Sequence, residues 1–277
     1  MQQDDIDNYK ETPRTLVKGD GFVYLLPHQV LRPWISNYTI SFPPRCKMTK
    51  SYAVIPHGCA TLVFSCDDRG IRGHLFGPTT KPACVGSEAN RSLMLFIAEF
   101  QPGGYYAFSG MPQGELTDCV IPFAWVNPAL NRLMEQQIET AQGIHSLVAE
   151  IDRLFLAHLK GAFFRGEFSR ATKMIIESGG QATVRALSRD VSYSERHLGR
   201  IFGEYLGVNI KPFSRLVRIN KAIRLLRRPQ YSLTQVYLEA GYYDLPHFVH
   251  DFKATCGLTP QVYRENMSDF YSEIAKY

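Results

Sequence analysis

The chain lacks the features that would direct it into a membrane or an oxidising compartment. It does not open with a charged segment followed by an apolar one, and no apolar run approaches the roughly eighteen residues of a membrane span. Its six cysteines are scattered without a CxxC pair, which fits a reduced compartment and speaks against both a disulfide framework and a zinc site. We therefore expect a cytoplasmic protein that does not associate with membranes.

The sequence also lacks the residue patterns that catalysis requires. It contains no P-loop, no dinucleotide-binding glycine pattern and no pairing of a nucleophile with a base. A metal-dependent enzyme of the cupin type would need an HxH cluster with Glu and a further His, whereas His57 and His74 are isolated. We expect a protein that is not an enzyme and that has no cofactor and no bound metal.

The basic residues of the chain are unevenly distributed. With 277 residues, 45% hydrophobic and 21% charged, the chain is long enough for two ordinary globular domains. Residues 168–266 hold 15 Lys and Arg against 8 Asp and Glu, a net charge of +7, while the remainder holds 16 basic and 18 acidic residues. A basic excess confined to one region is suited to neutralising phosphate groups.

Residues 21–160 are predicted to form a β-rich domain that ends in two helices. Short apolar runs at 22–26, 53–55, 61–64 and 93–100 are separated by Pro, Gly and Asp clusters, as in a barrel or sandwich. Asn127 and Pro128 then begin a helix, and a second helix follows Gly143 as far as Leu159. Residues 1–20 are polar and are predicted to be a flexible arm, and residues 161–167 a linker.

A pattern of helix, tight turn and helix occupies residues 232–252. Ser232 and Gln235 have the spacing of a capping box, so the first helix begins here. Gly241 supplies the left-handed conformation that ends this helix, and Asp244 caps the next. The second helix turns Phe248 inward, and we expect Asp251 to add a negative charge to its outer surface.

A second unit of the same kind lies upstream, because Leu198 precedes Phe248 by 50 residues. Its second helix has an apolar face with helical spacing, made by Leu198, Ile201, Phe202 and Tyr205. Between the two units, residues 210–228 are predicted to form one helix. Over roughly 18 residues this helix would span about 27 Å, which can hold two recognition helices near one DNA turn, about 34 Å, apart.

The tandem units, followed by Thr259 and Pro260 at the start of one more short helix, resemble the C-terminal signature of the AraC/XylS family of bacterial transcription regulators. In the other half, Pro-Gly motifs near Trp34, His57 and Gln101 resemble a sensor-type N-terminal domain of one subgroup. That subgroup usually has an acidic residue or Asn in place of His57, and often Arg in place of Gln101.

The resemblance implies an α+β multidomain protein. Its N-terminal domain would be a β-rich barrel or sandwich with trailing helices. Its C-terminal domain, residues 168–266, would be all-α, with two helix-turn-helix units joined by a long helix and followed by a tail at 267–277. Such a protein binds promoter DNA and acts beside RNA polymerase, so we expect an activator that responds to a small molecule. The alternatives are a repressor, or a DNA-binding protein whose N-terminal domain only dimerises.

In such a unit the N-terminal part of the second helix meets base edges in the major groove. Arg196 and Arg200 are the strongest candidates, because Arg can bind guanine with two hydrogen bonds worth about 1–3 kcal/mol of discrimination. The alternative is a surface pair with Glu195 or Glu204. The second unit is expected mainly to position the protein. The full set of expected DNA contacts is Ser194, Glu195, Arg196, Gly199, Arg200, Leu245, Pro246, His247, His250, Lys253 and Arg264.

Lys253 and Arg264 belong to this set as phosphate contacts. His247 and His250 are three residues apart, but with no third ligand nearby we do not expect a metal site.

Aromatic residues of the N-terminal half are candidates for an effector pocket, with plain core packing as the alternative. The helices within residues 127–159 are expected to provide a dimer contact or to pass the effector state to the linker. The candidate pocket residues are Trp34, Tyr38, Tyr52, His57, Phe64, Phe96, Tyr105 and Tyr106.

Overall fold

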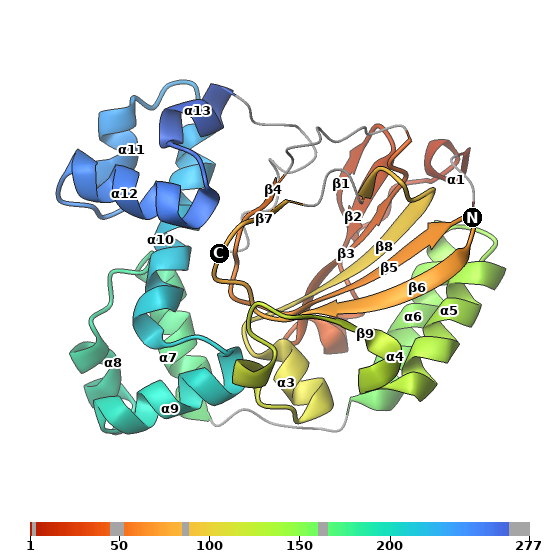
Figure 1. Cartoon of the computed structure of the whole chain (residues 1–277), viewed down its shortest axis with the longest axis horizontal. Helices are drawn as coiled ribbons and strands as arrows, with labels where there is room; N and C mark the ends of the chain where they lie inside the picture. Colours follow the sequence, from red (N-terminus) through yellow and green to blue (C-terminus); the bar gives the residue numbers. More distant parts are fainter. Residues whose placement is uncertain (2–3, 45–52, 85–88, 160–165, 266–277) are drawn as a thin grey trace.

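The computed structural model describes residues 1, 4–44, 53–84, 89–159 and 166–265. Figure 1 shows an antiparallel sheet with helices in the N-terminal half and a purely helical C-terminal half. The predicted α+β organisation is therefore confirmed. The expected linker and tail lie outside the described residues, except that Gly166 and Glu167 already belong to the first C-terminal helix. In the described part of the chain, no helix combines the length and the apolar character needed to cross a bilayer.

A seven-stranded sheet in the order β1-β2-β3-β8-β5-β6-β9 forms the N-terminal half, and a separate pair of strands, β4 and β7, lies beside it. The four apolar runs seen in the sequence correspond to β2, β4, β5 and β8. The strands are β1 (Thr15–Gly19), β2 (Phe22–Leu25), β3 (Ile35–Ser41), β4 (Ala53–Val54), β5 (Thr61–Asp67), β6 (Gly70–Phe76), β7 (Ala83–Cys84), β8 (Met94–Phe100) and β9 (Val120–Pro122).

The stretch that we expected to be a flexible arm contains secondary structure within residues 4–20. They contain a short helix, α1 (Asp4–Asp7), and the edge strand β1, which pairs with β2. Ile6 and Tyr9 are buried in the N-terminal core, and the hydroxyls of Tyr9 and Thr15 lie 2.6 Å apart. The sequence gives little sign of this strand because its side chains are only half-buried or exposed.

Helices cover the sheet and close its core. Short helices η1 (Gln29–Leu31), α3 (Gly104–Ser109) and η2 (Gln113–Glu115) lie between strands in the chain. The last strand is followed by the short helix α4 (Phe123–Val126) and the two long helices α5 (Pro128–Thr140) and α6 (Ile144–His158). Asn127 caps α5 by accepting a hydrogen bond from the Leu130 amide at 3.0 Å, as predicted. In α6, the buried Asp152 accepts from Tyr38 at 3.1 Å and pairs with Arg14 at 2.7 Å. This link fastens the helix to the β3 and β1 side of the sheet.

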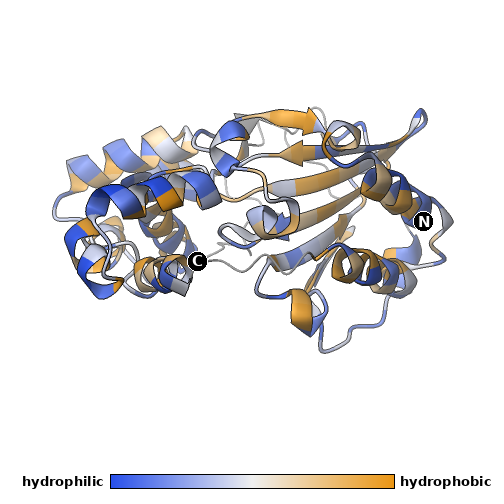
Figure 2. Cartoon of the chain, turned by 90° about the horizontal axis from the view of Figure 1, so that it is seen from below, coloured by the Kyte–Doolittle hydropathy of each residue, from blue (hydrophilic) through white to orange (hydrophobic). Residues whose placement is uncertain are grey.

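The C-terminal half consists of two units that share one long helix. The first unit contains α7 (Gly166–Glu177), α8 (Val184–Asp190), α9 (Glu195–Leu206) and the start of α10 (Ile210–Leu226). The second unit contains the end of α10 with α11 (Leu233–Glu239), α12 (Leu245–Cys256) and α13 (Pro260–Glu265). In Figure 2 these helices carry both hydrophilic and hydrophobic residues, as expected of helices that bury one face.

The predicted helix boundaries of the second unit are confirmed. Ser232 and Gln235 form both hydrogen bonds of a capping box at the start of α11. Gly241 has a φ of 87°, in the left-handed region that glycine adopts without strain. Asp244 accepts a hydrogen bond from the amide of His247 at 2.7 Å and so begins α12. The long helix α10 ends at Leu226, two residues before the predicted boundary.

Candidate nucleic-acid interface

Helix α9 is held by its apolar face and leaves its opposite face exposed. Leu198 and Phe202 lie in the core of the first unit. Ser194 caps the helix by accepting from the His197 amide at 3.2 Å. The expected contact residues Glu195, Arg196 and Arg200 are exposed, and Gly199 is half-buried. The structure thus places the predicted residues of this helix on one accessible surface.

Arg200 is engaged in an ion pair within its own helix. Its Nη1 atom lies 3.3 Å from Oε2 of Glu204, one turn further along α9. The alternative anticipated from the sequence, a pair with Glu204, is therefore present. Such an exposed pair contributes at most about 1 kcal/mol, so it can give way to a stronger partner for the guanidinium.

Helix α12 presents a different surface. Leu245, Pro246, His247 and His250 are all exposed at its N-terminal half, as expected. Only the histidines among them can form hydrogen bonds through their side chains. Within the described residues, no group of three or more His, Cys, Asp or Glu side chains is placed to hold a metal ion.

Asp251 does not face outward, which corrects the expectation of a negative charge on this surface. The residue is 3% exposed and lies on the buried side of α12. Tyr242 donates to its Oδ2 atom at 3.3 Å, and Nε of Arg215 from α10 lies 3.4 Å from Oδ1. Nε2 of His247 lies 3.5 Å from the same carboxylate. The carboxylate therefore ties α12 to α10 and orients one of the exposed histidines.

The two expected phosphate contacts differ in their surroundings. Lys253 is exposed in the last turn of α12. Arg264, in α13, is half-buried and donates from Nη2 to the carbonyl of Tyr231 at 3.2 Å. This hydrogen bond to the loop before α11 gives Arg264 a structural role in the second unit. Lys253 is therefore the better candidate for a phosphate contact.

Two tyrosines next to the recognition helices were missed in the sequence. Tyr243 is 94% exposed and directly precedes the cap of α12. Tyr193 occupies the matching place before α9, 50 residues upstream, and packs its ring against His197 with 4.6 Å between centroids. Aligning the two units by their 50-residue offset would have identified both positions.

None of the candidate effector residues lines either of two hollows found in the described part of the chain, one between α7 and α8 and one beside Tyr9 and His145. Tyr38, Phe64, Phe96 and Tyr105 belong to the packed N-terminal core, where burial raises the pKa of Tyr38 well above its usual value. Trp34 is partly buried against the same core, and the buried His57 accepts a hydrogen bond from the Cys59 amide. Tyr106 contacts the C-terminal half instead. Tyr52 lies outside the described residues.

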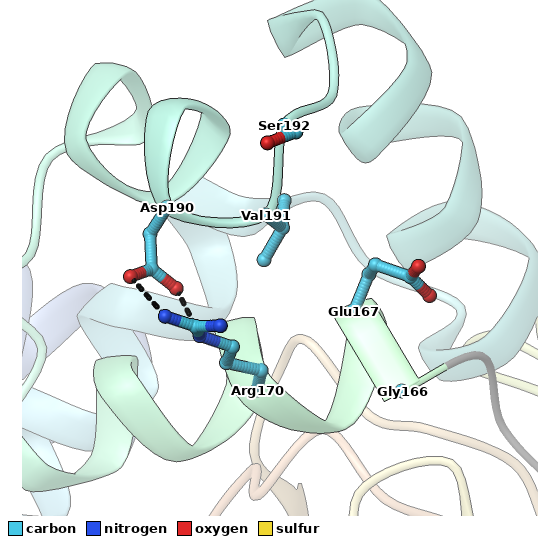
Figure 3. Close-up of a pocket in the computed structure, with 6 residues that line it drawn as sticks. All are labelled: Gly166, Glu167, Arg170, Asp190, Val191 and Ser192. Carbon is cyan, nitrogen blue, oxygen red and sulfur yellow. Dashed lines mark hydrogen bonds and ion pairs between the residues drawn. The ribbon is translucent and has the colours of Figure 1, made fainter.

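An open hollow lies elsewhere, between α7 and the end of α8. It is lined by Gly166, Glu167, Arg170, Asp190, Val191 and Ser192 (Figure 3). The guanidinium of Arg170 points at the carboxylate of Asp190, with Nη2 2.8 Å from Oδ1. This pair involves two of the three charged side chains that line the hollow, and Glu167 is the third.

Comparison with known proteins gives separate matches for the two halves. A model described as a helix-turn-helix domain matches residues 187–266. One described as a domain of unknown function (DUF6597) matches residues 24–122. An uncharacterized HTH-type transcriptional regulator of Haemophilus influenzae is 32% identical over 85 residues, which are 31% of this chain and 28% of that protein. The Msm operon regulatory protein of Streptococcus mutans is 25% identical over 126 residues, 44% of this chain and 45% of that protein.

The chain thus spans less than half the length of these curated relatives. Among solved structures, ToxT from Vibrio cholerae aligns with 79% of this chain and 95% of its own, at 9% identity and a TM-score of 0.43. That likeness is too loose to support a statement about function. The helix-turn-helix match begins within α8 and covers the rest of the two units, from α9 to α13. Residues 187–266 are thus a helix-turn-helix domain of the AraC type.

Proposed function

We propose that the protein is a transcription regulator that binds promoter DNA sequence-specifically through α9 and α12. The observation that carries this proposal is the pair of capped helices with exposed N-terminal faces, joined by the 17-residue helix α10. At 1.5 Å per residue α10 is about 26 Å long, which suits two helices that enter neighbouring major grooves. The net charge of +7 over residues 168–266 supports contact with phosphates.

The two helices would have different roles in DNA recognition. Arg196 and Arg200 of α9 can each form two hydrogen bonds with a guanine. Leu245 and Pro246 of α12 can contact a thymine methyl group but offer no directional hydrogen bond from their side chains. Base specificity would therefore come mainly from α9, while α12 and Lys253 position the protein on the duplex.

Selection from random duplex DNA tests this proposal. The wild-type protein should enrich two short sequence boxes about one helical turn apart. In Arg196→Ala or Arg200→Ala, the preference for particular bases in one of these boxes should fall. Arg153→Ala is a matched control, because Arg153 is an exposed arginine that also pairs with a Glu of its own helix, Glu150, at 2.7 Å. Salt-sensitive binding without any enriched motif would contradict sequence-specific recognition.

The direction of regulation is proposed from the family. We take activation beside RNA polymerase, in the cytoplasm, as the working model, with repression as the alternative. A promoter carrying the selected boxes, placed before a reporter, separates the two. Expression that falls when the regulator is removed supports activation, and expression that rises supports repression.

A second candidate role of the N-terminal domain is dimerisation without a ligand. This role requires that the exposed apolar side chains of the domain have a partner. Val120, Trp125 and Leu133 are large apolar residues exposed on neighbouring elements β9, α4 and α5, and Trp125 is 80% exposed. A second copy of the chain would cover this face. Trp125→Ala should then shift the sedimentation coefficient of the full chain from dimer to monomer, and a wild-type monomer would contradict this role.

Effector binding is tested separately. A ligand that binds only the folded domain raises its melting temperature in a concentration-dependent way. A shift for one compound in a broad panel would support the sensor role that the family suggests. Absence of any shift, together with a dimer that depends on Trp125, would favour the role in dimerisation alone.

A further inference from the structure

The two DNA-binding units have separate hydrophobic cores. Phe213 and Val217 of α10 belong to the core of the first unit, and Ile219 and Ile223 belong to the core of the second. Within the C-terminal half, α10 is the helix that contributes to both. The angle between the two recognition helices therefore depends on the straightness of one helix, unless another part of the chain also contacts both units.

One segment of the N-terminal domain, which we name the first strap, makes such a double contact. It comprises residues 55–59. Ile55 is 3% exposed and packs into the core of the second unit, whereas Cys59 is 2% exposed and packs into the core of the first. Between them, Gly58 has a φ of 64° and lies so close to α10 that an added Cβ would be 3.0 Å from Cδ1 of Leu216.

A second strap, residues 77–82, touches equivalent points on the two units. Gly207 and Gly257 end α9 and α12 and lie 50 residues apart, both in the left-handed conformation. A Cβ added to Gly207 would be 3.0 Å from Cγ of Pro78, and one added to Gly257 would be 3.4 Å from Cγ of Pro82. The same short segment thus lies against the C-terminal ends of both recognition helices.

The second strap is itself firmly held. Thr80 donates to Asp118 from its amide at 2.7 Å and from its hydroxyl at 2.6 Å. The amide of Asp118 in turn donates to the carbonyl of Pro78 at 2.9 Å. The neighbouring Thr117 donates to the carbonyl of Gly207 at 2.8 Å, which fastens this turn to the end of α9.

From these contacts we propose that the N-terminal domain sets the spacing between the two DNA boxes that the protein accepts. Both straps connect the first unit to the second independently of α10, so they resist bending of that helix. A change in the N-terminal domain that loosens either strap changes the spacing at which both recognition helices can bind together. The inference rests on the proposed function, because it assumes that α9 and α12 read DNA.

The test uses the full chain and duplexes that carry both selected boxes with spacers from three base pairs shorter to three longer. Ile55→Ala removes the first strap's contact with the second unit. Ile138→Ala is the matched control, because Ile138 is 2% exposed but packs wholly within the N-terminal core. We expect the preference of the wild type for its best spacer to fall by about threefold or more in Ile55→Ala, a change of roughly 0.6 kcal/mol, and to persist in the control.

The sequences of the selected boxes distinguish a looser contact between strap and unit from unfolding of the second unit. If Ile55→Ala only lets the angle between the two recognition helices vary, both boxes keep their sequences while the spacer preference broadens. A blurred second box with an unchanged spacer preference would mean that the second unit has lost its own core, and this result would overturn the inference. An unchanged spacer preference with both boxes intact would overturn it as well.

A measurement without DNA distinguishes failure of the inference from failure of the proposed function. Spin labels on non-natural residues at the exposed positions Ser169 in α7 and Glu239 in α11 report the distance between the units. We expect a narrow distance distribution in the wild type and a broader one in Ile55→Ala. Equal widths would overturn the role of the strap, whether or not the protein selects a DNA motif.

Discussion

The ring of Tyr106, from the N-terminal domain, stacks on the ring of Tyr205 in α9, with 4.4 Å between centroids and 30° between planes. The Tyr106 hydroxyl also donates to Oε1 of Glu204 at 3.3 Å, and the other oxygen of Glu204 pairs with Arg200. Two successive side-chain contacts, through Glu204, therefore link the N-terminal domain to Arg200, which we propose contacts bases.

Replacing Tyr106 should weaken the contact between the two halves. Tyr106→Ala loses both the stack and the hydrogen bond, and we expect the free energy of unfolding to fall by about 1–3 kcal/mol. Tyr106→Phe keeps the ring and should cost about 1 kcal/mol or less. Urea unfolding followed by circular dichroism measures both. Equal losses for the two variants would show that the ring stack contributes nothing.

Asp251 should be among the most sensitive polar positions of the second unit. Asp251→Ala leaves Tyr242 without its buried acceptor and Arg215 without its partner, so we expect a loss of about 2–4 kcal/mol in the free energy of unfolding. Arg215→Ala should cost less, because that side chain is half exposed. A double-mutant cycle measures their coupling. Additive effects of the two substitutions would contradict a direct interaction.

The C-terminal half could be predicted from sequence because its signals are local. Capping residues such as Ser194, Ser232 and Asp244 determine where helices begin within a few residues of chain. The apolar face of α9 follows from side-chain spacing alone. The inward orientation of Asp251 could not be predicted, because its partner Arg215 lies on another helix, 36 residues away in sequence.

The second unit should lose stability at high pH. Burial, more than the nearby carboxylate of Asp251, raises the pKa of Tyr242 to about 12. Since the unfolded value is about 10, the stabilisation is complete below pH 10 and is lost as the pH rises to about 12. Burial also raises the pKa of Tyr263 and of Cys256.

Tyr242→Phe tests this prediction. The variant removes one titrating group, so its free energy of unfolding should fall less steeply between pH 10 and 12, by roughly 2–3 kcal/mol at most. Urea midpoints measured across this range give the slope. The same slope in Tyr242→Phe and the wild type would exclude a contribution from this hydroxyl.

Lys253 and Arg264 should behave differently although both are basic. Lys253→Ala should weaken binding to all DNA sequences alike and reduce the slope of log K against log salt by about 1. Arg264→Ala should leave that slope unchanged and lower the stability of the second unit, because Arg264 donates to Tyr231. Fluorescence anisotropy at several salt concentrations measures the slopes. A lowered slope for Arg264→Ala would assign that residue to the DNA surface.

The N-terminal half was less predictable because its contacts join distant parts of the chain. The strand β1 lacks an apolar pattern, and β3 pairs with β8 nearly sixty residues later. Tyr106 and His57 were grouped with a pocket because aromatic residues line cores, pockets and interfaces alike. Only the folded chain shows that Tyr106 leaves the core and stacks on α9.

The first strap also has a consequence for the synthesis of the protein. Ile219, a core neighbour of Ile55, follows it by 164 residues, so at about 5–20 residues per second the ribosome adds it roughly 8–33 s later. During that interval the nascent N-terminal domain lacks the partner residues that bury Ile55 in the complete chain. Chaperones that bind apolar segments therefore have a site on the growing chain that disappears once the second helix-turn-helix unit is complete.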